Sequence, residues 1–231
     1  MRGKKEEKLT FSDKLGKWIY KNRKLLISLI VILLIGGIAV ALGTSSIKKN
    51  IEKNFSQLNN LVDEYSMLTR DFDKTEDEKL AESKVIAEEM IALAEANKKN
   101  GVALRAYMNA AEIYYDNGDF ALAAECWENA AKVNEKAYTA GISLYNASVC
   151  YEELGNIDAA IAALEKAAAN ENFPLATKAM FNQGRLEEAK SNYDAAYDIY
   201  NALVAKNASD EWAKLAKTRA IYLEEENLIN Q

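Results

Sequence analysis

Residues 104–135 read LRAYMNAAEIYYDNGDFALAAECWENAAKVNE and predict two amphipathic helices joined by a turn. Tyrosine and alanine recur at helical spacing in the first half, and aromatic residues and alanine repeat that spacing in the second half. These positions are Tyr107, Ala110, Ala111 and Tyr114, followed by Phe120, Ala123, Trp127 and Ala130. Gly118 separates the two halves, because glycine enters the left-handed conformation that ends a helix at little steric cost. We therefore expect the helices to pack side by side, with alanines where their backbones come closest.

The same pattern recurs twice downstream. Ala123, Ala160 and Ala196 occupy equivalent positions, 37 and 36 residues apart. A period in the mid-thirties that is built from two helices is typical of a solenoid of helical hairpins. The third copy is the loosest, because Ser191 replaces the turn glycine. The further members of the two copies are Leu144, Ala147, Ser148, Tyr151, Gly155, Ile157, Leu164 and Ala167, then Met180, Gly184, Tyr193 and Tyr200.

This unit resembles the tetratricopeptide repeat (TPR), whose large–small–aromatic positions, turn glycine and small–aromatic–small second helix it contains. The resemblance covers residues 104–207 and implies an all-α, right-handed solenoid of three helical hairpins. Residues 208–231 repeat only the first-helix positions, through Trp212, Leu215 and Ala216, so we expect a capping helix there. The composition agrees, since an alanine-rich chain with one proline in 231 residues favours helix almost throughout.

The chain has few residues of the types that enzymes use for catalysis or for binding metals and cofactors. The chain has no histidine, so it lacks the commonest general base and the commonest metal ligand. It also has no glycine-rich phosphate loop and no closely spaced cysteine pair. We therefore predict a protein that is not an enzyme and that has no catalytic, cofactor-binding or metal-binding residues. Cys126 and Cys150 fall on neighbouring helices of the expected stack, where two buried thiols are favoured and a disulfide is the alternative.

Residues 1–24 form a basic segment with nine Lys or Arg residues, three acidic residues and a net charge of +6. Phe11, Leu15, Trp18 and Ile19 share one helical face, which predicts a helix resting on a membrane surface with its lysines near anionic lipid. A disordered basic tail is the alternative. The remainder of the chain has a net charge of −12, which argues against nucleic-acid binding.

Residues 25–47 contain no charged side chain and predict a transmembrane signal-anchor. As a helix they reach about 35 Å, which is enough to cross the hydrocarbon core of a membrane. A cleaved signal peptide with a site at Ala39-Val40-Ala41 is the alternative, but the long basic region and the long apolar core disfavour it. Few basic residues follow, so the positive-inside rule places the N-terminus in the cytoplasm. We expect a single-pass protein of the bacterial inner membrane with a periplasmic TPR domain.

Residues 48–103 predict two membrane-proximal helices that form a degenerate hairpin. Apolar residues recur from Ile47 to Phe72 at steps of three and four, which indicates an amphipathic helix. Either a coiled coil or packing on the solenoid would bury its apolar face, and packing is favoured because a solenoid end needs covering. A second helix is expected over residues 80–98. Its inward residues are predicted to be Val85, Ile86, Met90, Leu93 and Ala94.

The first helices of TPR hairpins line a concave face, which the resemblance makes the expected binding groove. The carboxylate clamp of some TPR domains needs lysine and asparagine where this chain has Met108 and Glu112, so that clamp is absent. The groove suits an extended or helical polypeptide, with a preference for basic and apolar segments, better than a metabolite. The helix Ile51–Phe72 folding into the groove is the alternative. The predicted groove residues are Arg105, Met108, Glu112, Tyr115, Tyr145, Val149, Glu152, Glu153, Lys178, Phe181 and Arg185.

Tyr145, Val149 and Phe181 form the apolar centre of this groove. We expect them to have no role in packing within a repeat and to contact the partner, since exposed apolar stripes are typical of interaction sites.

The layout of a basic segment, one span and an exported TPR domain resembles the ancillary subunit of the bacterial Sec translocon (YfgM-like proteins). That resemblance implies partners in the Sec translocon and among periplasmic chaperones. Two other functions stay open: a structural scaffold of the cell envelope, in division or outer-membrane assembly, and an adaptor that recruits an enzyme.

Overall fold

The computed structural model describes residues 10–229, and within that range every regular element is a helix. The predicted all-α class is therefore confirmed. The chain divides into two units, residues 1–53 and residues 54–231. The helices are α1 (Phe11–Thr69), α2 (Glu76–Ala96), α3 (Gly101–Asp116), α4 (Phe120–Val133), α5 (Tyr138–Glu153), α6 (Ile157–Ala169), α7 (Ala176–Ala189), α8 (Tyr193–Lys206) and α9 (Glu211–Glu225).

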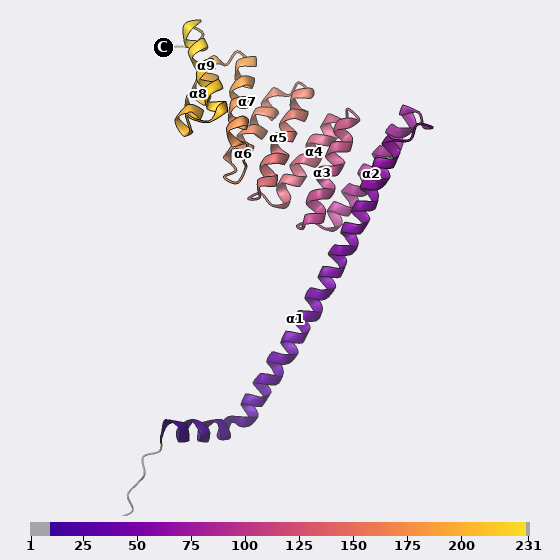
Figure 1. Ribbon diagram of the computed structural model, residues 1–231, viewed down its shortest axis with the longest axis vertical. Coiled ribbons are helices and arrows are strands. Elements are labelled where there is room, and N and C mark those ends of the chain that lie inside the picture. The colour runs from indigo at the N-terminus through magenta and orange to yellow at the C-terminus, as the bar shows by residue number, and fades with distance from the viewer. Residues whose placement is uncertain (1–9, 230–231) are drawn as a thin grey trace, which may run out of the picture. The chain divides into compact units, whose positions relative to one another are not determined.

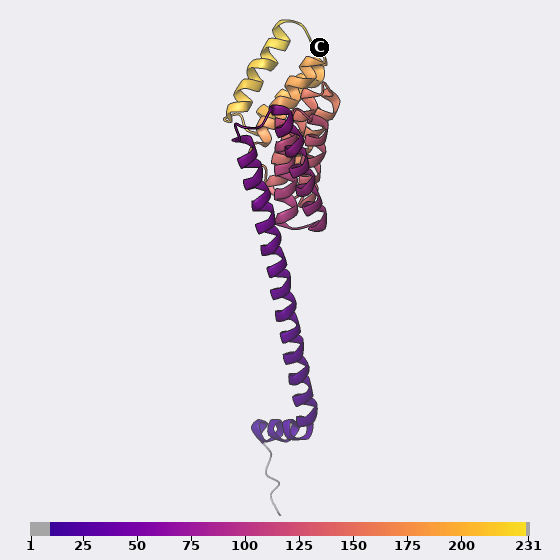
Figure 2. The ribbon, with the colours of Figure 1, turned by 90° about the vertical axis from the view of Figure 1, so that its right-hand side faces the viewer.

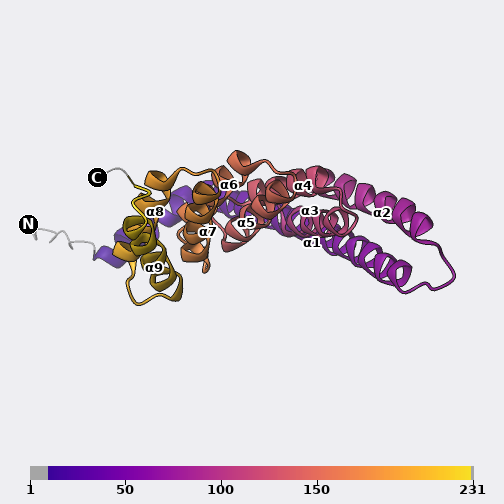
Figure 3. The ribbon, with the colours of Figure 1, turned by 90° about the horizontal axis from the view of Figure 1, so that it is seen from above.

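The second unit contains a solenoid in which α2 packs on α3, and each later helix packs on the one before it as far as α9. Figures 1 and 3 show these helices following one another in a row from α2 to α9. The hairpins α3–α4, α5–α6 and α7–α8 correspond to the three predicted repeats. Helix α9 also packs on α7, so it occupies the place of a further first helix.

The three hairpin turns share one backbone conformation. Gly118, Gly155 and Ser191 have φ angles of 77°, 68° and 63°. In each turn the next residue's N–H reaches back to close the end of the first helix: Asp119 donates to the Tyr114 carbonyl at 2.8 Å, and Asn192 donates to the Glu187 carbonyl at 2.9 Å. This is the Schellman arrangement that ends helices at a left-handed residue. The serine of the third repeat thus adopts the conformation that was predicted for a turn glycine.

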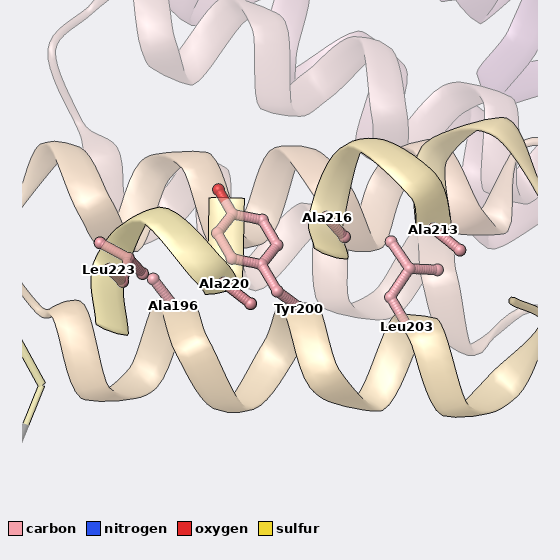
Figure 4. Packing of buried hydrophobic residues seen from close by; sticks show 7 residues of the cluster. All are labelled: Ala196, Tyr200, Leu203, Ala213, Ala216, Ala220 and Leu223. Atoms are coloured by element: carbon pink, nitrogen blue, oxygen red, sulfur yellow. The ribbon is translucent and has the colours of Figure 1, made fainter. Parts of the chain in front are cut away.

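Small residues lie where paired helices meet, as the sequence predicts. Ala123, Ala160 and Ala196 are all fully buried. A Cβ atom at Gly184 of α7 would lie only 2.5 Å from the ring of Tyr200 on α8, so only glycine leaves room for that ring. Figure 4 shows Tyr200 packed among the residues that join α8 to α9: Ala196, Leu203, Ala213, Ala216, Ala220 and Leu223.

Residues 54–69 of α1 pack on the solenoid, which was the favoured prediction for this stretch. Leu58, Leu61 and Leu68 are buried, and the Asn54 side chain donates to the Asn97 side chain at 2.8 Å. The predicted extent of this helix was wrong at its end, because α1 stops at Thr69 and Phe72 lies beyond it with 98% of its surface exposed.

The face of α2 was also predicted with one error. Ile86, Met90, Leu93 and Ala94 are buried as expected, whereas Val85 is 54% exposed. The buried residues recur at steps of three and four, and a residue one position before Ile86 is rotated by about 100° around the helix toward solvent. A capping box between Thr75 and Glu78 begins this helix.

In the first unit, α1 holds the apolar stretch that the sequence predicts as a span. This helix is long and apolar enough to cross a membrane, and the side chains of its most apolar window are not buried by other parts of the chain. Figures 1 and 2 show a sharp bend early in α1, so its indigo first turns run crosswise to the stretch that follows. Residues 1–9 of the predicted basic segment and residues 230–231 of the predicted capping segment lie outside the described residues.

Candidate binding surface on the first helices

Two junctions between successive first helices are closed by arginine–carboxylate pairs. Arg185 of α7 donates from one guanidinium nitrogen to both carboxylate oxygens of Glu152 on α5, at 2.9 and 2.7 Å. Arg219 of α9 binds Glu188 of α7 through two nitrogens, one of them Nε at 3.1 Å. The two pairs occupy equivalent positions one repeat apart. Multiple bonds between a guanidinium and a carboxylate fix geometry as well as adding energy.

Aromatic contacts fill the face beside these pairs. The Lys178 ammonium lies 5.2 Å from the centre of the Tyr145 ring and 5.6 Å from that of Trp212. The Phe181 ring lies 5.4 Å from Trp212. Asn182 donates to the Tyr145 hydroxyl oxygen at 2.8 Å. The expectation of no packing role within a repeat is wrong for Phe181, because its ring centre lies 5.7 Å from that of Tyr200 on α8 of the same hairpin. Tyr145 is instead engaged between repeats, by Lys178 and Asn182 of the following first helix.

The junction between α3 and α5 differs from the other two. Tyr115 and Val149 stand where the later junctions have glutamate and arginine, so no ion pair can form between these positions. The Tyr115 ring packs against Phe120, with ring centres 5.2 Å apart. A hollow of about 300 Å³ opens between the two helices, and we call it the α3–α5 hollow. Its lining residues are Glu112, Tyr115, Asp116, Trp127, Asn146 and Val149.

The α3–α5 hollow carries negative charge beside apolar walls. Partial burial raises the pKa of Glu112 above its ordinary value, and the nearby Asp116 carboxylate raises it further. The Tyr65 hydroxyl donates to Asp116 at 3.2 Å, and burial together with Asp116 raises the pKa of Tyr65 to about 12. Within residues 10–229 neither Glu112 nor Asp116 forms an ion pair with a lysine or arginine. The hollow is therefore suited to a cationic group with an apolar stem.

The structure divides the eleven predicted groove residues into three groups. Glu112, Tyr115 and Val149 meet at the α3–α5 hollow. Five others are engaged with side chains of this same chain: Tyr145, Glu152, Lys178, Phe181 and Arg185. Of the remaining three, Arg105 lies 5.8 Å over the Phe55 ring, Met108 is half-buried and Glu153 is exposed.

Trp127 and Asn146 line the hollow, and Tyr65 contacts it through Asp116, but none of these three was predicted as a site residue. Trp127 belongs to the second helix, where the sequence pattern indicates only core packing. Asn146 recurs with Asn109 and Asn182, a pattern that indicates local hydrogen bonding between repeats. Tyr65 lies on α1, far from the repeats in sequence. The contact between Tyr65 and Asp116 could be predicted only by knowing which helices are neighbours in space.

The end of α1 lies beside the first repeat. A Cβ atom at Gly101 of α3 would lie 3.3 Å from the Phe55 ring, and Tyr65 reaches Asp116. Among the described residues no hydrogen bond, ion pair or ring contact joins residues 54–69 to α5 or α7. Residues 54–69 therefore lie beside α3 and do not cover the face formed by α5 and α7.

The cysteines do not form a disulfide in this structure. Cys126 and Cys150 are both free and buried. Burial raises the pKa of the Cys126 thiol to about 12 and that of the Cys150 thiol to about 11, so both stay protonated and unreactive at neutral pH. Of the two states that the sequence left open, the structure has the buried thiols.

Comparison with known proteins identifies the repeat. The family model described as "Tetratricopeptide repeat" matches residues 88–145, 108–170 and 151–211, which together span more than half of the chain. The chain belongs to the tetratricopeptide repeat family. TPR domains of this kind are scaffolds for protein–protein interaction, and the TPR domain of this chain is the solenoid described above.

Relatives of the TPR domain support this assignment. A TPR repeat-containing protein of Treponema pallidum (strain Nichols) is 33% identical over 111 residues, 48% of this chain and 46% of the relative. The chain therefore spans about half the length of that curated relative. Two crystal structures of nearly identical TPR-like repeats, from a Podosopora anserina protein described as a kinesin light chain, align at 15% identity. Both have a TM-score of 0.52 and cover 74% of this chain, with 88% and 87% of their own chains covered. At this identity they support the fold alone.

Proposed function

We propose that the chain is a single-pass protein of the bacterial inner membrane whose exported TPR domain binds polypeptide segments with a basic side chain among apolar ones. The interrupted series of arginine–carboxylate pairs supports this proposal. Glu152 and Glu188 each have an arginine from the next first helix. At the α3–α5 hollow Val149 takes the arginine position, and Glu112 and Asp116 are left beside an open space.

The chemistry of the missing partner follows from the pairs that are present. A carboxylate beside apolar side chains gains from a guanidinium that binds it directly, as Glu152 and Glu188 do. An arginine or lysine of a bound polypeptide would supply that cation, and its methylene stem would pack on Tyr115, Trp127 and Val149. Neighbouring apolar residues of the partner would lie along the rest of the concave face.

The layout of the chain supports a role in protein export. A basic segment, the uncharged residues 25–47 and a TPR domain resemble the ancillary subunit of the Sec translocon. In that position the domain would meet polypeptides as they emerge from the channel. We propose that it holds such segments, or passes them to periplasmic chaperones, together with the translocon. An acidic concave face would attract the basic segments of these clients, and added salt would weaken that attraction.

A pair of substitutions at Val149 tests the binding site. Val149→Arg places a guanidinium in the α3–α5 hollow from within the chain, so it should occupy the acidic groups and block a partner's cation. Val149→Leu enlarges the side chain without charge and is the matched control. The measurement is binding of residues 54–231 to a synthetic apolar peptide with one arginine, compared with the same peptide carrying uncharged citrulline.

We expect the arginine peptide to bind at least tenfold more tightly than the citrulline peptide, since one charged hydrogen bond contributes about 1.5–3 kcal/mol. Val149→Arg and Glu112→Gln should both remove that preference, and Val149→Leu should keep it. Equal binding of the two peptides would contradict the site's preference for a cation.

Crosslinking in membranes tests the partner. A photoreactive residue at Tyr115 should capture translocon subunits, chaperones or their clients, and the same residue at exposed Glu125 on α4 should not. Capture of division or cell-wall proteins at Tyr115 would instead support a scaffold of the cell envelope.

A further inference from the structure

The start of α1 is fixed by a reciprocal pair of hydrogen bonds. The Thr10 N–H donates to the Asp13 carboxylate at 3.0 Å, and the Asp13 N–H donates to the Thr10 hydroxyl oxygen at 3.3 Å. The bonds from the Thr10 side chain and backbone lower the pKa of Asp13, so this carboxylate stays charged. Asp13 is the one acidic residue in residues 10–24. Its carboxylate lies at the N-terminus of the helix, where a negative charge is favourable.

Two stripes run along the first turns of α1. The apolar stripe is exposed to solvent, with Trp18 54% exposed. Its members are Phe11, Leu15, Trp18 and Ile19. The basic stripe follows at steps of three and four residues, so its side chains also lie along one side of the helix. Its members are the exposed residues Lys14, Lys17, Lys21 and Lys24.

The charge of the basic stripe is not neutralised within the described chain. None of its four lysines forms an ion pair in residues 10–229. The guanidinium of Arg23 lies 4.4 Å from the centre of the Tyr20 ring, which keeps that charge beside an aromatic group. The uncharged residues 25–47 begin directly afterwards. The positive stripe therefore lies next to the segment proposed to enter the bilayer.

We propose that residues 11–24 lie in the plane of the membrane surface and bind the headgroups of anionic phospholipids. This inference rests on the membrane anchoring in the proposed function. The apolar stripe would enter the boundary between headgroups and acyl chains, where Trp18 is favoured. The lysine stripe beside it would meet lipid phosphates. The density of uncompensated positive charge is the reason to assign an anionic lipid surface rather than an apolar partner helix.

Trp18 reports on this contact. The full chain is reconstituted into vesicles of phosphatidylcholine, with or without phosphatidylglycerol, and brominated lipids quench tryptophan fluorescence. Subtracting the signal of a Trp18→Phe variant isolates Trp18 from the two tryptophans of the TPR domain. We expect Trp18 to be quenched strongly in the vesicles that contain phosphatidylglycerol, and less in the neutral ones or at high salt.

Charge substitutions on either side of the uncharged stretch make a matched pair. Lys17→Gln with Lys21→Gln should reduce the equilibrium constant for surface binding by about fivefold for each lysine removed. Lys48→Gln with Lys49→Gln removes the same charge after the stretch and should leave Trp18 quenching unchanged. Equal quenching in neutral and anionic vesicles, or no effect of the first pair, would overturn the proposal.

Alkaline carbonate extraction separates failure of this inference from failure of the proposed function. A chain that stays in the membrane pellet while Trp18 quenching is independent of lipid charge contradicts only the headgroup contact. A chain that carbonate releases contradicts the membrane anchor, and the headgroup proposal fails with it.

Discussion

Ser191 has the left-handed conformation at the turn between α7 and α8, with a φ angle of 63°. A residue with a Cβ atom pays about 1–2 kcal/mol for this conformation, whereas glycine adopts it freely. Ser191→Gly should therefore raise the free energy of unfolding of residues 54–231 by about 1 kcal/mol, measured by urea denaturation. Ser191→Ala keeps a Cβ atom and is the control. An equal gain for alanine would mean that the backbone strain is not the cause.

Ala160 is fully buried where α6 meets its neighbours. Ala160→Leu would add a large side chain to a packed site and should lower the free energy of unfolding by about 1–3 kcal/mol. Ala162→Leu makes the same change at an exposed position of α6 and should stay within about 0.5 kcal/mol of the unchanged chain. Thermal or urea unfolding that ranked the two variants the other way would contradict the buried position of Ala160.

Single residues show where sequence reasoning succeeds and where it stops. Repeat spacing predicted that Ser191 takes the place of a turn glycine, because the Schellman turn depends on local backbone geometry. Val85 and Phe72 were placed inward wrongly. One step along a helix changes the direction of a side chain by about 100°, so an error of one residue in the buried stripe or in the helix end moves a side chain to solvent.

At the scale of elements, the helices and their pairing follow from periodicity, but the contacts between repeats do not. The sequence placed Glu152 and Arg185 on one face as separate groove residues. The structure joins them, because equivalent first helices lie close enough for side chains to cross between them. The interruption at Val149 becomes visible only once that series of pairs is known. For this reason the sequence predicted Glu112, Tyr115 and Val149 as groove residues, but it did not predict the hollow that they form with Trp127.

The pair between α7 and α9 makes stability depend on pH. Burial alone would raise the pKa of Glu188, but hydrogen bonds from Arg219 and Tyr200 outweigh it and hold the pKa below the ordinary value of 4.5. A carboxylate with a lowered pKa in the folded state stabilises the fold above its unfolded-state pKa. That contribution is lost as the pH falls from about 4.5 through the lower folded-state value.

Glu188→Gln should remove this part of the acid dependence. The variant should be less stable than the unchanged chain at neutral pH, and the difference should shrink as the pH falls below about 4.5. Urea unfolding across this range measures it, and Glu165→Gln at an exposed position of α6 is the control. A constant difference at every pH would show that the charge of Glu188 does not stabilise the junction.

At the scale of the whole molecule, the charge asymmetry around residues 25–47 predicts the topology. Lys24→Cys should stay protected from a membrane-impermeant maleimide added to intact spheroplasts, and Lys48→Cys should react. The unchanged chain is the control, since its buried thiols have raised pKa values and should not label. Reaction of Lys24→Cys alone would reverse the orientation. A mature N-terminus at Leu42 would show that the apolar stretch is a cleaved signal peptide.

Amide hydrogen exchange should show that the stack opens unevenly. In a solenoid each hairpin contacts only its neighbours, so strain at the Ser191 turn lowers the cost of opening α7–α9 without loosening α3–α5. The amide of Leu203 should then exchange faster than that of Trp127, although both side chains are buried. Ser191→Gly should slow the exchange of Leu203. Fraying of this kind would let the last repeats open and close while a polypeptide stays bound at the first junction.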